Sequence, residues 1–457
     1  MRVSSYQDDH FDVVIIGGGP SGTAAGITLL KRDGISVAVV EQSDYTSFRI
    51  GESLSPGIRP LLEYLDIWEQ FKQEQSLESF GSQAAWGSDS LQGLDYMFTL
   101  HGPGWSLDRR RFDRMLAESF RQRGGTLFTK TRFIRCEQIS GNDWAVYVKN
   151  PDKTFRIIHC QYLMDATGRR GTLAKQLGAT RQIHDHLVGV GRVGQLPEST
   201  CLESCIQVEA CEYGWWYTAP IPGNRVSVVL MSDADIVNRM KAAQSKQWNR
   251  LLNGLEMTSN RISGVTFVDT PKVFSSFSSC LQQVGGKNWG AVGDAVASHD
   301  PLSSTGIPHA IGSGVHGAIV ALSALLSNGG LLESFKKSIH EDFYQYLQTH
   351  WKYYQRETRW TDSLFWKRRC TPISIDPHTV IKNVECSTEA TYFDSTHLSN
   401  HLYEQLLGIC QEGESIHNIV NKFSDIHPQL PDQKIILGIQ ELMFSNHIKT
   451  DNFNMLE

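Results

Sequence analysis

The strongest constraint on the fold is a glycine-rich turn placed between an apolar strand and a helix. Residues 11–16 read FDVVII, and the next six residues read GGGPSG. A short, apolar, β-branched run of this kind predicts a buried parallel strand. The composition of residues 23–31 predicts a helix, and a second apolar run, VAVV, ends just before Glu41. Strand, glycine turn, helix and strand together predict a βαβ unit, and hence an α/β fold that begins with a Rossmann-type domain.

The spacing of the glycines in this turn predicts a dinucleotide site. Gly17 allows the tight turn from strand to helix, Gly19 lets the backbone approach a pyrophosphate, and Gly22 permits close packing of helix on strand. The helix N-terminus then faces the phosphates with free N–H groups. Glu41 stands where an acid accepts the hydroxyl groups of the ribose.

Two later elements favour FAD, bound non-covalently, over NAD. Residues 289–300 read WGAVGDAVASHD, which predicts a strand that ends in Gly-Asp before a glycine-rich helix start, and residues 165–169 read DATGR. An NAD domain needs no such late anchors. Asp294 has one structural alternative, as the N-cap of the following helix. The predicted cofactor-binding residues are Gly17, Gly19, Ser21, Gly22, Glu41, Gln42, Ser53, Arg111, Gly168, Asp294, Ser304, Thr305, Gly306 and Ile307.

These motifs resemble the FAD superfamily of aromatic hydroxylases, geranylgeranyl reductases and flavin-dependent halogenases. The resemblance covers residues 11–327. The sequence DPLSSTG at 300–306 and the sequence GES at 51–53 are similar to the halogenase branch, and DRRRFD at 108–113 is similar to an arginine-bearing helix start beside the flavin. The resemblance implies a tryptophan-halogenase-like fold, in which an antiparallel-sheet substrate domain follows the FAD-binding domain.

Three departures narrow the resemblance. The segment at 81–87, GSQAAWG, lacks the lysine of tryptophan halogenases, and GWWYTAPIP at 214–222 alters the spacing of their W-x-W-x-I-P motif. DATGRRG replaces the Asp-Gly-x-x-Ser motif of single-component hydroxylases. The combination most resembles the LodB, GoxB and QhpG type of flavoprotein, which matures tryptophylquinone enzymes. This implies that the partner is the precursor protein of a quinone-dependent enzyme.

The chemistry expected of such a site is oxygen activation by reduced flavin, which needs a dry, aromatic-walled pocket. No second glycine fingerprint follows a strand, so the electrons come either from NAD(P)H bound directly or from a separate flavin reductase. Trp86, Trp215, Trp216 and Tyr217 are predicted to wall the pocket, and for the aromatic strand at 214–222 a place in the core is the alternative. The predicted catalytic residues are Glu52, His299, His309 and Trp216, and each of these also has a structural alternative.

The sequence predicts that the chain is divided into four parts. Residues 1–80, 105–185 and 280–330 form the FAD-binding domain, and residues 81–104 and 186–279 form the substrate domain. Residues 331–400 are a helical extension. Residues 401–457 form a small helical module, which is similar to the winged-helix modules that grip leader peptides; dimerisation and core capping are its alternatives.

Charge and composition argue against several classes of partner. The net charge of -6 gives no basic face for nucleic acid or for an anionic membrane surface. We find no apolar run long enough to span a bilayer and no signal peptide at the N-terminus, so we expect a cytoplasmic protein. Nine cysteines, an odd number, indicate reduced thiols, and the spacing of Cys201, Cys205 and Cys211 does not predict a metal site.

The function predicted from the sequence is FAD-dependent hydroxylation of a tryptophan side chain in a partner protein. Three alternatives stay open: halogenation of a free indole or phenol, reduction of an isoprenoid chain, and a flavin-binding scaffold without catalytic activity.

Overall fold

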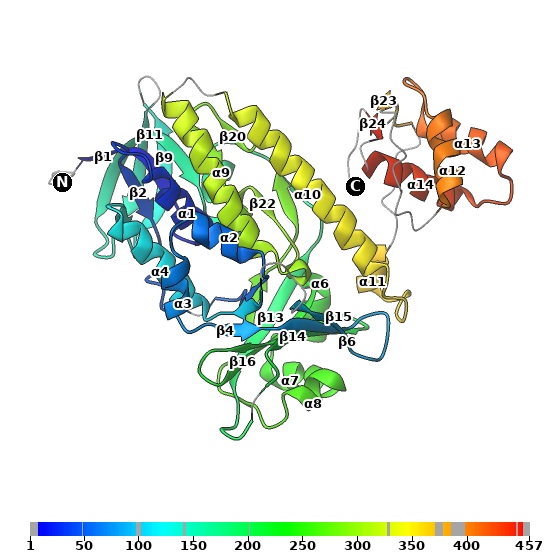
Figure 1. Ribbon diagram of the computed structural model, residues 1–457, viewed down its shortest axis with the longest axis horizontal. Coiled ribbons are helices and arrows are strands. Elements are labelled where there is room, and N and C mark those ends of the chain that lie inside the picture. Colours follow the sequence, from blue (N-terminus) through cyan, green and yellow to red (C-terminus); the bar gives the residue numbers. More distant parts are fainter. Residues whose placement is uncertain are drawn as a thin grey trace. The chain divides into compact units, whose positions relative to one another are not determined.

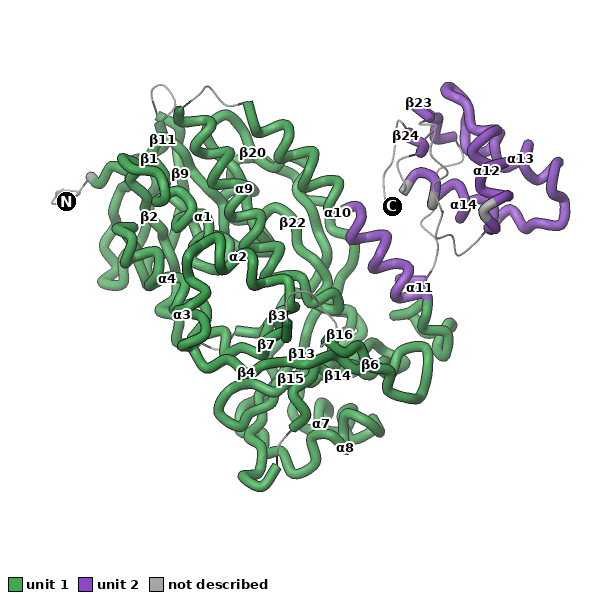
Figure 2. Tube along the Cα trace, viewed as in Figure 1, with its two compact units in different colours: residues 1–343, 356–366 green, residues 344–355, 367–457 purple. Residues whose placement is uncertain are grey.

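The structure is a computed structural model that describes residues 8–47, 49–96, 102–139, 143–200, 202–326, 330–370, 378–384, 398–444 and 447–450. The chain forms two compact units (Figure 2). Unit 1 comprises residues 1–343 and 356–366, and unit 2 comprises residues 344–355 and 367–457.

The first sheet of unit 1 has a parallel centre, as the βαβ pattern predicts. β1 (Asp8–Ile16) lies between β2 (Val37–Val40) and β11 (Phe155–Asp165), and both pairings are parallel. β11 is one continuous strand of 11 residues. The remaining strands of this sheet are β8 (Thr126–Phe128), β9 (Arg132–Gln138), β10 (Trp144–Lys149), β20 (Gly285–Gly286) and β21 (Trp289–Ala291).

Two glycine-rich helices of unit 1, α1 (Pro20–Leu29) and α9 (Gly306–Leu326), lie side by side (Figure 1). Their backbones approach so closely that side chains do not fit between them. A Cβ added at Gly314 would lie 2.3 Å from the carbonyl oxygen of Ser21. Within the turn itself, a Cβ at Gly22 would lie 1.9 Å from the carbonyl oxygen of Gly17. The third glycine of the fingerprint therefore has the packing role that its spacing predicts.

Substitution of Gly314 by alanine is expected to lower the free energy of unfolding by about 2 kcal/mol, because the new methyl group overpacks a backbone contact. Gly312 is the matched control on the same helix, since its added Cβ meets no atom within 4 Å. Gly312→Ala should stabilise the protein by up to about 1 kcal/mol through helix propensity. Chemical denaturation of the two variants measures the difference, and equal midpoints would contradict the close contact.

α9 also has the length and composition of a membrane-crossing helix, with a mean hydropathy of 1.5. It is the sole helix of this kind within the described ranges, and the sequence analysis did not single it out. Half of its most apolar stretch is buried inside the protein. Its contacts with α1, β11 and β21 account for its apolar composition as a core helix.

Local features of the sequence set where the next helices of unit 1 begin and end. Asp66, whose φ of 55° is left-handed, separates α2 (Ile58–Tyr64) from α3 (Trp68–Gln73). α4 (Arg109–Gln122) begins directly after Asp108, because the Asp108 carboxylate caps it by accepting the N–H of Arg110 at 3.0 Å.

The second large sheet has the strand order β17-β13-β16-β15-β14-β5-β6, and β18 also pairs with β13. It is antiparallel except where β14 pairs with β5. All residues of β15 are buried, so this strand is covered on both faces. The strands are β5 (Gly81–Ala85), β6 (Gln92–Asp95), β13 (Leu187–Gln195), β14 (Cys205–Cys211), β15 (Gly214–Ile221), β16 (Arg225–Asp233), β17 (Thr266–Phe267) and β18 (Lys272–Ser275).

The described part of unit 1 also contains two small sheets, several short helices and 3-10 turns. Two small sheets have the strand orders β3-β7-β4 and β12-β19-β22. Their strands are β3 (Ser53–Leu54), β4 (Leu77–Ser79), β7 (Gly104–Ser106), β12 (Arg181–Ile183), β19 (Ser279–Leu281) and β22 (Ala297–Ser298). The helices are α5 (Thr172–Gln176), α6 (Ala234–Met240), α7 (Ser245–Asn253) and α8 (Met257–Arg261), with 3-10 turns at Gly168–Arg170, Gly293–Ala295 and Pro301–Ser303.

A short stretch beyond α10 (Leu332–Tyr354) clamps the β5–β6 hairpin within unit 1. The Glu357 carboxylate accepts the N–H of Gly87 at 2.7 Å and pairs with the Arg359 guanidinium at 2.6 Å. Arg359 also pairs with Asp89 at 2.6 Å. At the start of α11 (Leu364–Cys370), the Trp366 ring packs edge-on against the Trp86 ring. We call residues 356–366 the clamp segment.

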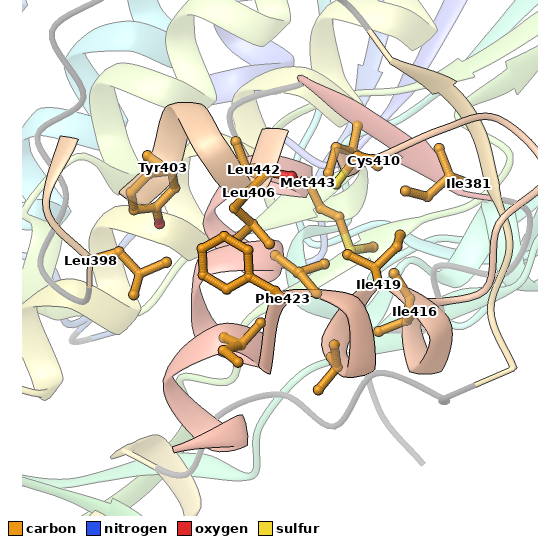
Figure 3. Close-up of a cluster of buried hydrophobic side chains, with 14 residues drawn as sticks. Ile381, Leu398, Tyr403, Leu406, Cys410, Ile416, Ile419, Phe423, Leu442 and Met443 are labelled. Atoms are coloured by element: carbon orange, nitrogen blue, oxygen red, sulfur yellow. Dashed lines mark hydrogen bonds between the residues drawn. The ribbon is translucent and has the colours of Figure 1, made fainter. Parts of the chain in front are cut away.

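Besides the last residues of α10 and α11, the described part of unit 2 contains a module of three helices and a two-stranded sheet. The helices are α12 (Asn400–Ile409), α13 (Ile416–Ile426) and α14 (Asp432–Phe444), and β23 (Ile381–Val384) pairs antiparallel with β24 (Ile448–Thr450). Figure 3 shows Leu406, Ile419, Phe423 and Leu442 converging between the helices, where all four are fully buried. This module therefore has a hydrophobic core of its own.

Candidate functional site

A cavity of about 1260 Å³ lies in unit 1. The residues at or just after the carboxyl ends of β1, β2 and β11 form one part of its lining, and residues of β14, β15 and β18 form another. Ligands of open α/β sheets bind at the carboxyl ends of the parallel strands, and this cavity occupies that position.

The glycine turn faces this cavity with room for a ligand. Gly17 has a φ of 110°, which favours glycine, and a Cβ there would also collide with Ala166. Gly19 differs, because its φ of -76° suits any residue and an added Cβ meets no protein atom within 4 Å. Gly17, Gly19 and Ser21 all line the cavity. The open space at Gly19, directly before α1, fits the diphosphate of FAD.

Glu41 links the glycine turn to β2 and to an arginine that the sequence analysis did not identify. Its carboxylate accepts the N–H groups of Gly18 and Ser43, each at 2.8 Å. Arg49 pairs with Glu41 at 3.2 Å and with Asp113 at 2.9 Å. Glu41, Arg49 and the predicted residue Gln42 line the cavity. The acid is therefore oriented by the protein at the position expected for a ribose-binding residue.

The structure places Arg109 at the cavity, whereas Arg111 lies away from it. Arg109 donates to the carbonyl oxygen of Ile50 at 2.8 Å and pairs with Asp113 at 3.1 Å, and its side chain is 12% exposed. The Arg111 side chain is 47% exposed and pairs with Glu74. The two residues are separated by about half a helical turn, so they point in different directions from α4. Arg111, predicted as a cofactor-binding residue, does not line the cavity, whereas Arg109 does.

Arg109→Ala is expected to weaken FAD binding by about 10-fold or more, because it removes charge-assisted hydrogen bonds that fix the loop before Glu52. Arg111→Ala is the matched control on the same helix and should change the affinity by less than about 2-fold, since an exposed ion pair contributes little. Flavin titration followed by fluorescence measures both. Equal losses in the two variants would contradict this assignment.

The DATGR and GDA motifs meet through an ion pair. The Arg169 guanidinium pairs with the Asp294 carboxylate at 2.7 Å and also donates to the carbonyl oxygen of His299 at 2.7 Å. The Asp294 side chain therefore holds Arg169 and makes no cap to the short 3-10 turn it sits in. Gly168, with a φ of 67°, lines the cavity together with Arg169 and Asp294.

The segment before α9 supplies several of the remaining predicted residues. Ser304, Gly306 and Ile307 line the cavity, as does Ser53 of β3. Ser304 has a left-handed φ of 51°, which turns the chain into α9. Thr305 does not line the cavity, and its hydroxyl group lies 2.8 Å from that of Ser303. Gly22 also lies outside the lining and has the packing role described above.

The strand β15 places alternate aromatic residues on opposite sides of the second sheet. Trp215 and Tyr217 line the cavity. Trp216 points into the hydrophobic core on the other side, where its ring packs against Trp248 of α7 with centroids 5.2 Å apart. Successive strand residues face opposite ways, so Trp216 is excluded from the catalytic residues predicted from the sequence. Trp86 does not line the cavity either, because it packs against the clamp segment.

The two predicted catalytic histidines lie together, but only one faces the cavity. His299 lines it, and the His309 ring on α9 lies behind, with centroids 4.4 Å apart. Burial lowers the pKa of His309, so this ring stays neutral near pH 7. His309 therefore packs against His299 and does not itself line the cavity.

Glu52 is a buried acid in the cavity wall. Its carboxylate accepts the Tyr217 hydroxyl group at 3.1 Å and the N–H of Gly51 at 3.2 Å. Burial, as the largest influence, raises the pKa of Glu52, although hydrogen bonds from neighbours including Tyr217 oppose the rise. Burial and the nearby Glu52 carboxylate raise the pKa of Tyr217, so its hydroxyl group stays protonated and donates.

Residues 81–87, where a halogenase lysine is expected, contain no lysine. Residues 81–87 do not line the cavity. A different lysine, Lys272 of β18, does line it, next to Phe274. The sequence analysis missed Lys272 because no motif marks this strand.

Within the described ranges, no group of three or more His, Cys, Asp or Glu residues is placed to hold a metal ion. Of the three clustered cysteines, Cys201 lies outside the described residues, and Cys205 and Cys211 are buried free thiols.

The residues present fit FAD. The open space at Gly19, the acid at Glu41 and the positive side chains of Arg49 and Arg109 are suited to hold its adenosine and diphosphate parts. Trp215 and Tyr217 are suited to cover an apolar ring. Bound FAD would supply the redox chemistry, and the protein supplies binding, orientation and exclusion of water.

Comparisons with known proteins agree with this geometry. A family model described as FAD binding domain matches residues 10–338. The protein described as FAD-dependent oxidoreductase LodB, from Marinomonas mediterranea, is 32% identical over 365 residues, which span 79% of this chain and 97% of that protein. A tryptophan 2-halogenase from Chondromyces crocatus is 26% identical over 69% of this chain and 61% of its own length.

Solved structures show the same fold. The flavin-dependent halogenase CmlS has a TM-score of 0.72 at 19% identity and covers 98% of this chain and 97% of its own. The myxobacterial halogenase CndH also has a TM-score of 0.72, at 20% identity over 79% of this chain and 86% of its own. The peptidyl tryptophan dihydroxylase QhpG has a TM-score of 0.63 at 20% identity and covers 82% of this chain and 83% of its own.

Proposed function

We propose, from the premise that this chain belongs to the FAD binding domain family and is a halogenase-like FAD-dependent oxidoreductase, that it hydroxylates a tryptophan side chain in a partner protein. The partner is the precursor of an enzyme that carries a tryptophylquinone cofactor. O₂ supplies the oxygen atom, and NAD(P)H, bound directly or acting through a separate flavin reductase, supplies the electrons.

The observation that carries the proposal is the aromatic and aliphatic part of the cavity wall beside a buried acid. Trp215, Tyr217 and Phe274 line the cavity together with Ile206 and Val208. Such a wall excludes water, which protects oxygen chemistry from side reactions, and its rings suit contact with an indole. Glu52 and His299 also line the cavity, and each can take up or release a proton.

The relatives support the same reading. The match with LodB spans 97% of LodB and 79% of this chain. QhpG, which shares the fold, is a peptidyl tryptophan dihydroxylase essential for tryptophylquinone cofactor biogenesis.

Mass spectrometry of a co-expressed precursor tests the proposal. We expect one or more oxygen atoms to be added at a tryptophan when the wild-type protein is present, and none when a flavin-free variant replaces it. Halogen incorporation that depends on added halide would identify a halogenase instead. Consumption of O₂ and reduced flavin with no change in the mass of the precursor would overturn the proposal in favour of a scaffold.

A further inference from the structure

Glu52 is held in one orientation by three different parts of unit 1. Its backbone carbonyl accepts the N–H of Leu107 at 2.7 Å. Gly51, just before it, has a φ of 105°, and a Cβ there would lie 2.7 Å from the Arg109 guanidinium. The Tyr217 hydroxyl group, from the second sheet, donates to the carboxylate. The GES motif therefore has a physical reason: glycine is needed where the chain turns beneath Arg109, and the next side chain enters the cavity wall.

We propose that Glu52 is the catalytic base of this cavity and that Tyr217 is a positioning residue that orients the Glu52 carboxylate and tunes its proton affinity. This inference rests on the proposed function, because it names the group that receives the proton from the oxygenated tryptophan. His299 is the competing candidate, and the experiment below separates the two.

The step conserves atoms and electrons. Bound FAD, with O₂ and the electron donor, would supply the electrophilic oxygen atom. An indole carbon that has received this oxygen carries both the new oxygen and its original hydrogen. The C–H bond then breaks, and its electron pair returns to the ring and restores aromaticity. The proton passes to the Glu52 carboxylate, which becomes a carboxylic acid and later releases the proton to solvent. No further oxidant or reductant is needed in this step.

The groups that face Glu52 determine how its proton affinity responds to mutation. Among the described residues they include the Tyr217 hydroxyl group from β15, the Ser227 hydroxyl group from β16 and the backbone N–H groups of Gly51 and of Glu52 itself, and each of these favours the carboxylate form. Arg109 of α4 is the nearby permanent charge, and it is held against the carbonyl oxygens of the preceding loop. Removing the Tyr217 hydroxyl group therefore destabilises the carboxylate and moves its titration to higher pH.

The experiment combines a protonation readout with a rate readout. An infrared pH titration, taken as the difference between wild type and Glu52→Gln, reports the carboxyl band of Glu52 without turnover. We expect its midpoint above the ordinary range of a glutamate, and about one pH unit higher again in Tyr217→Phe. Tyr213→Phe is the matched control and should leave the midpoint unchanged. Tyr213 is a half-buried tyrosine in the turn between β14 and β15, and it does not line the cavity.

Single-turnover oxygenation of the precursor, measured against pH, supplies the rate readout. The wild-type rate should fall in acid as Glu52 is protonated, and the falling limb should move upward in Tyr217→Phe with the infrared midpoint. Glu52→Gln should lower the rate by about 100-fold or more and lose the limb. A wild-type limb retained in Glu52→Gln would overturn the inference and point to His299.

The two proposals fail in different ways. If the wild type oxygenates tryptophan but the limb and the infrared midpoint do not move in Tyr217→Phe, the role of Tyr217 is refuted and the proposed function stands. If the wild type oxygenates no tryptophan, the proposed function and the base assignment both fall. The infrared titration still decides whether Tyr217 tunes Glu52.

Discussion

Gly19→Val is expected to give a folded protein that no longer retains FAD. The Gly19 backbone suits a β-branched residue, and an added Cβ meets no protein atom, so the substitution does not disturb the fold. The valine side chain instead enters the space before α1 where the diphosphate approaches the helix N-terminus. We expect the affinity for FAD to fall by about 100-fold or more, equivalent to roughly 3 kcal/mol.

Absorbance of the purified protein and flavin titration measure this loss, and thermal unfolding in the absence of FAD confirms that the fold is intact. Gly57→Val is the matched control, because Gly57 also has ordinary backbone angles and no atom within 4 Å of an added Cβ, but it lies outside the cavity lining. Full retention of flavin by Gly19→Val would refute the assigned diphosphate site.

Glu357→Ala should lower the free energy of unfolding of unit 1 by about 3 kcal/mol, since it leaves a partly buried guanidinium without its main partner. Glu357 is 1% exposed, and its carboxylate accepts from the backbone of Gly87 as well as from Arg359. Its loss releases the clamp segment from the β5–β6 hairpin. Urea denaturation followed by tryptophan fluorescence measures the change, because Trp86 and Trp366 pack together beside this contact.

The comparison with Asp89→Asn separates the buried pair from the exposed one. The Asp89 side chain is 94% exposed, so its pairing with Arg359 should contribute less than about 1 kcal/mol to the free energy of unfolding.

The contribution of Glu357 to the free energy of unfolding should also depend on pH. Arg359 and backbone N–H groups hold the pKa of Glu357 below its ordinary 4.5, against the opposing effect of burial. Its stabilisation is therefore present above that pH and is lost in acid, where wild type and Glu357→Ala should converge. A constant difference down to pH 2 would contradict the ion pair.

The nucleotide-binding half of the site could be predicted from the sequence because its residues follow from local rules. A strand, a glycine turn and a helix must be adjacent in the chain, so Gly17, Gly19 and Glu41 are placed by spacing alone. Asp294 and Arg169 are far apart in the sequence, yet each sits at the end of a parallel strand, and such ends meet at one edge of the sheet.

The substrate half could not be predicted to the same depth, because it depends on which way single side chains point. The sequence GWWYTAPI shows an aromatic strand, but a shift of one residue exchanges the cavity face with the core face. Trp215 and Trp216 are thus indistinguishable until the sheet is built. Arg109 and Arg111 present the same difficulty on a helix. Arg49 and Lys272 carry no motif, and only tertiary packing brings them to the cavity.

The alternation along β15 has a consequence for how such cavities change shape. The ring of Trp216 is locked against Trp248, and its two chain neighbours form the wall on the other side of the same backbone. Repacking of Trp216 against α7 is therefore expected to shift Trp215 and Tyr217 in the cavity wall. Substitutions in α7 are therefore expected to change which substrate the cavity prefers, although no residue of α7 lines it.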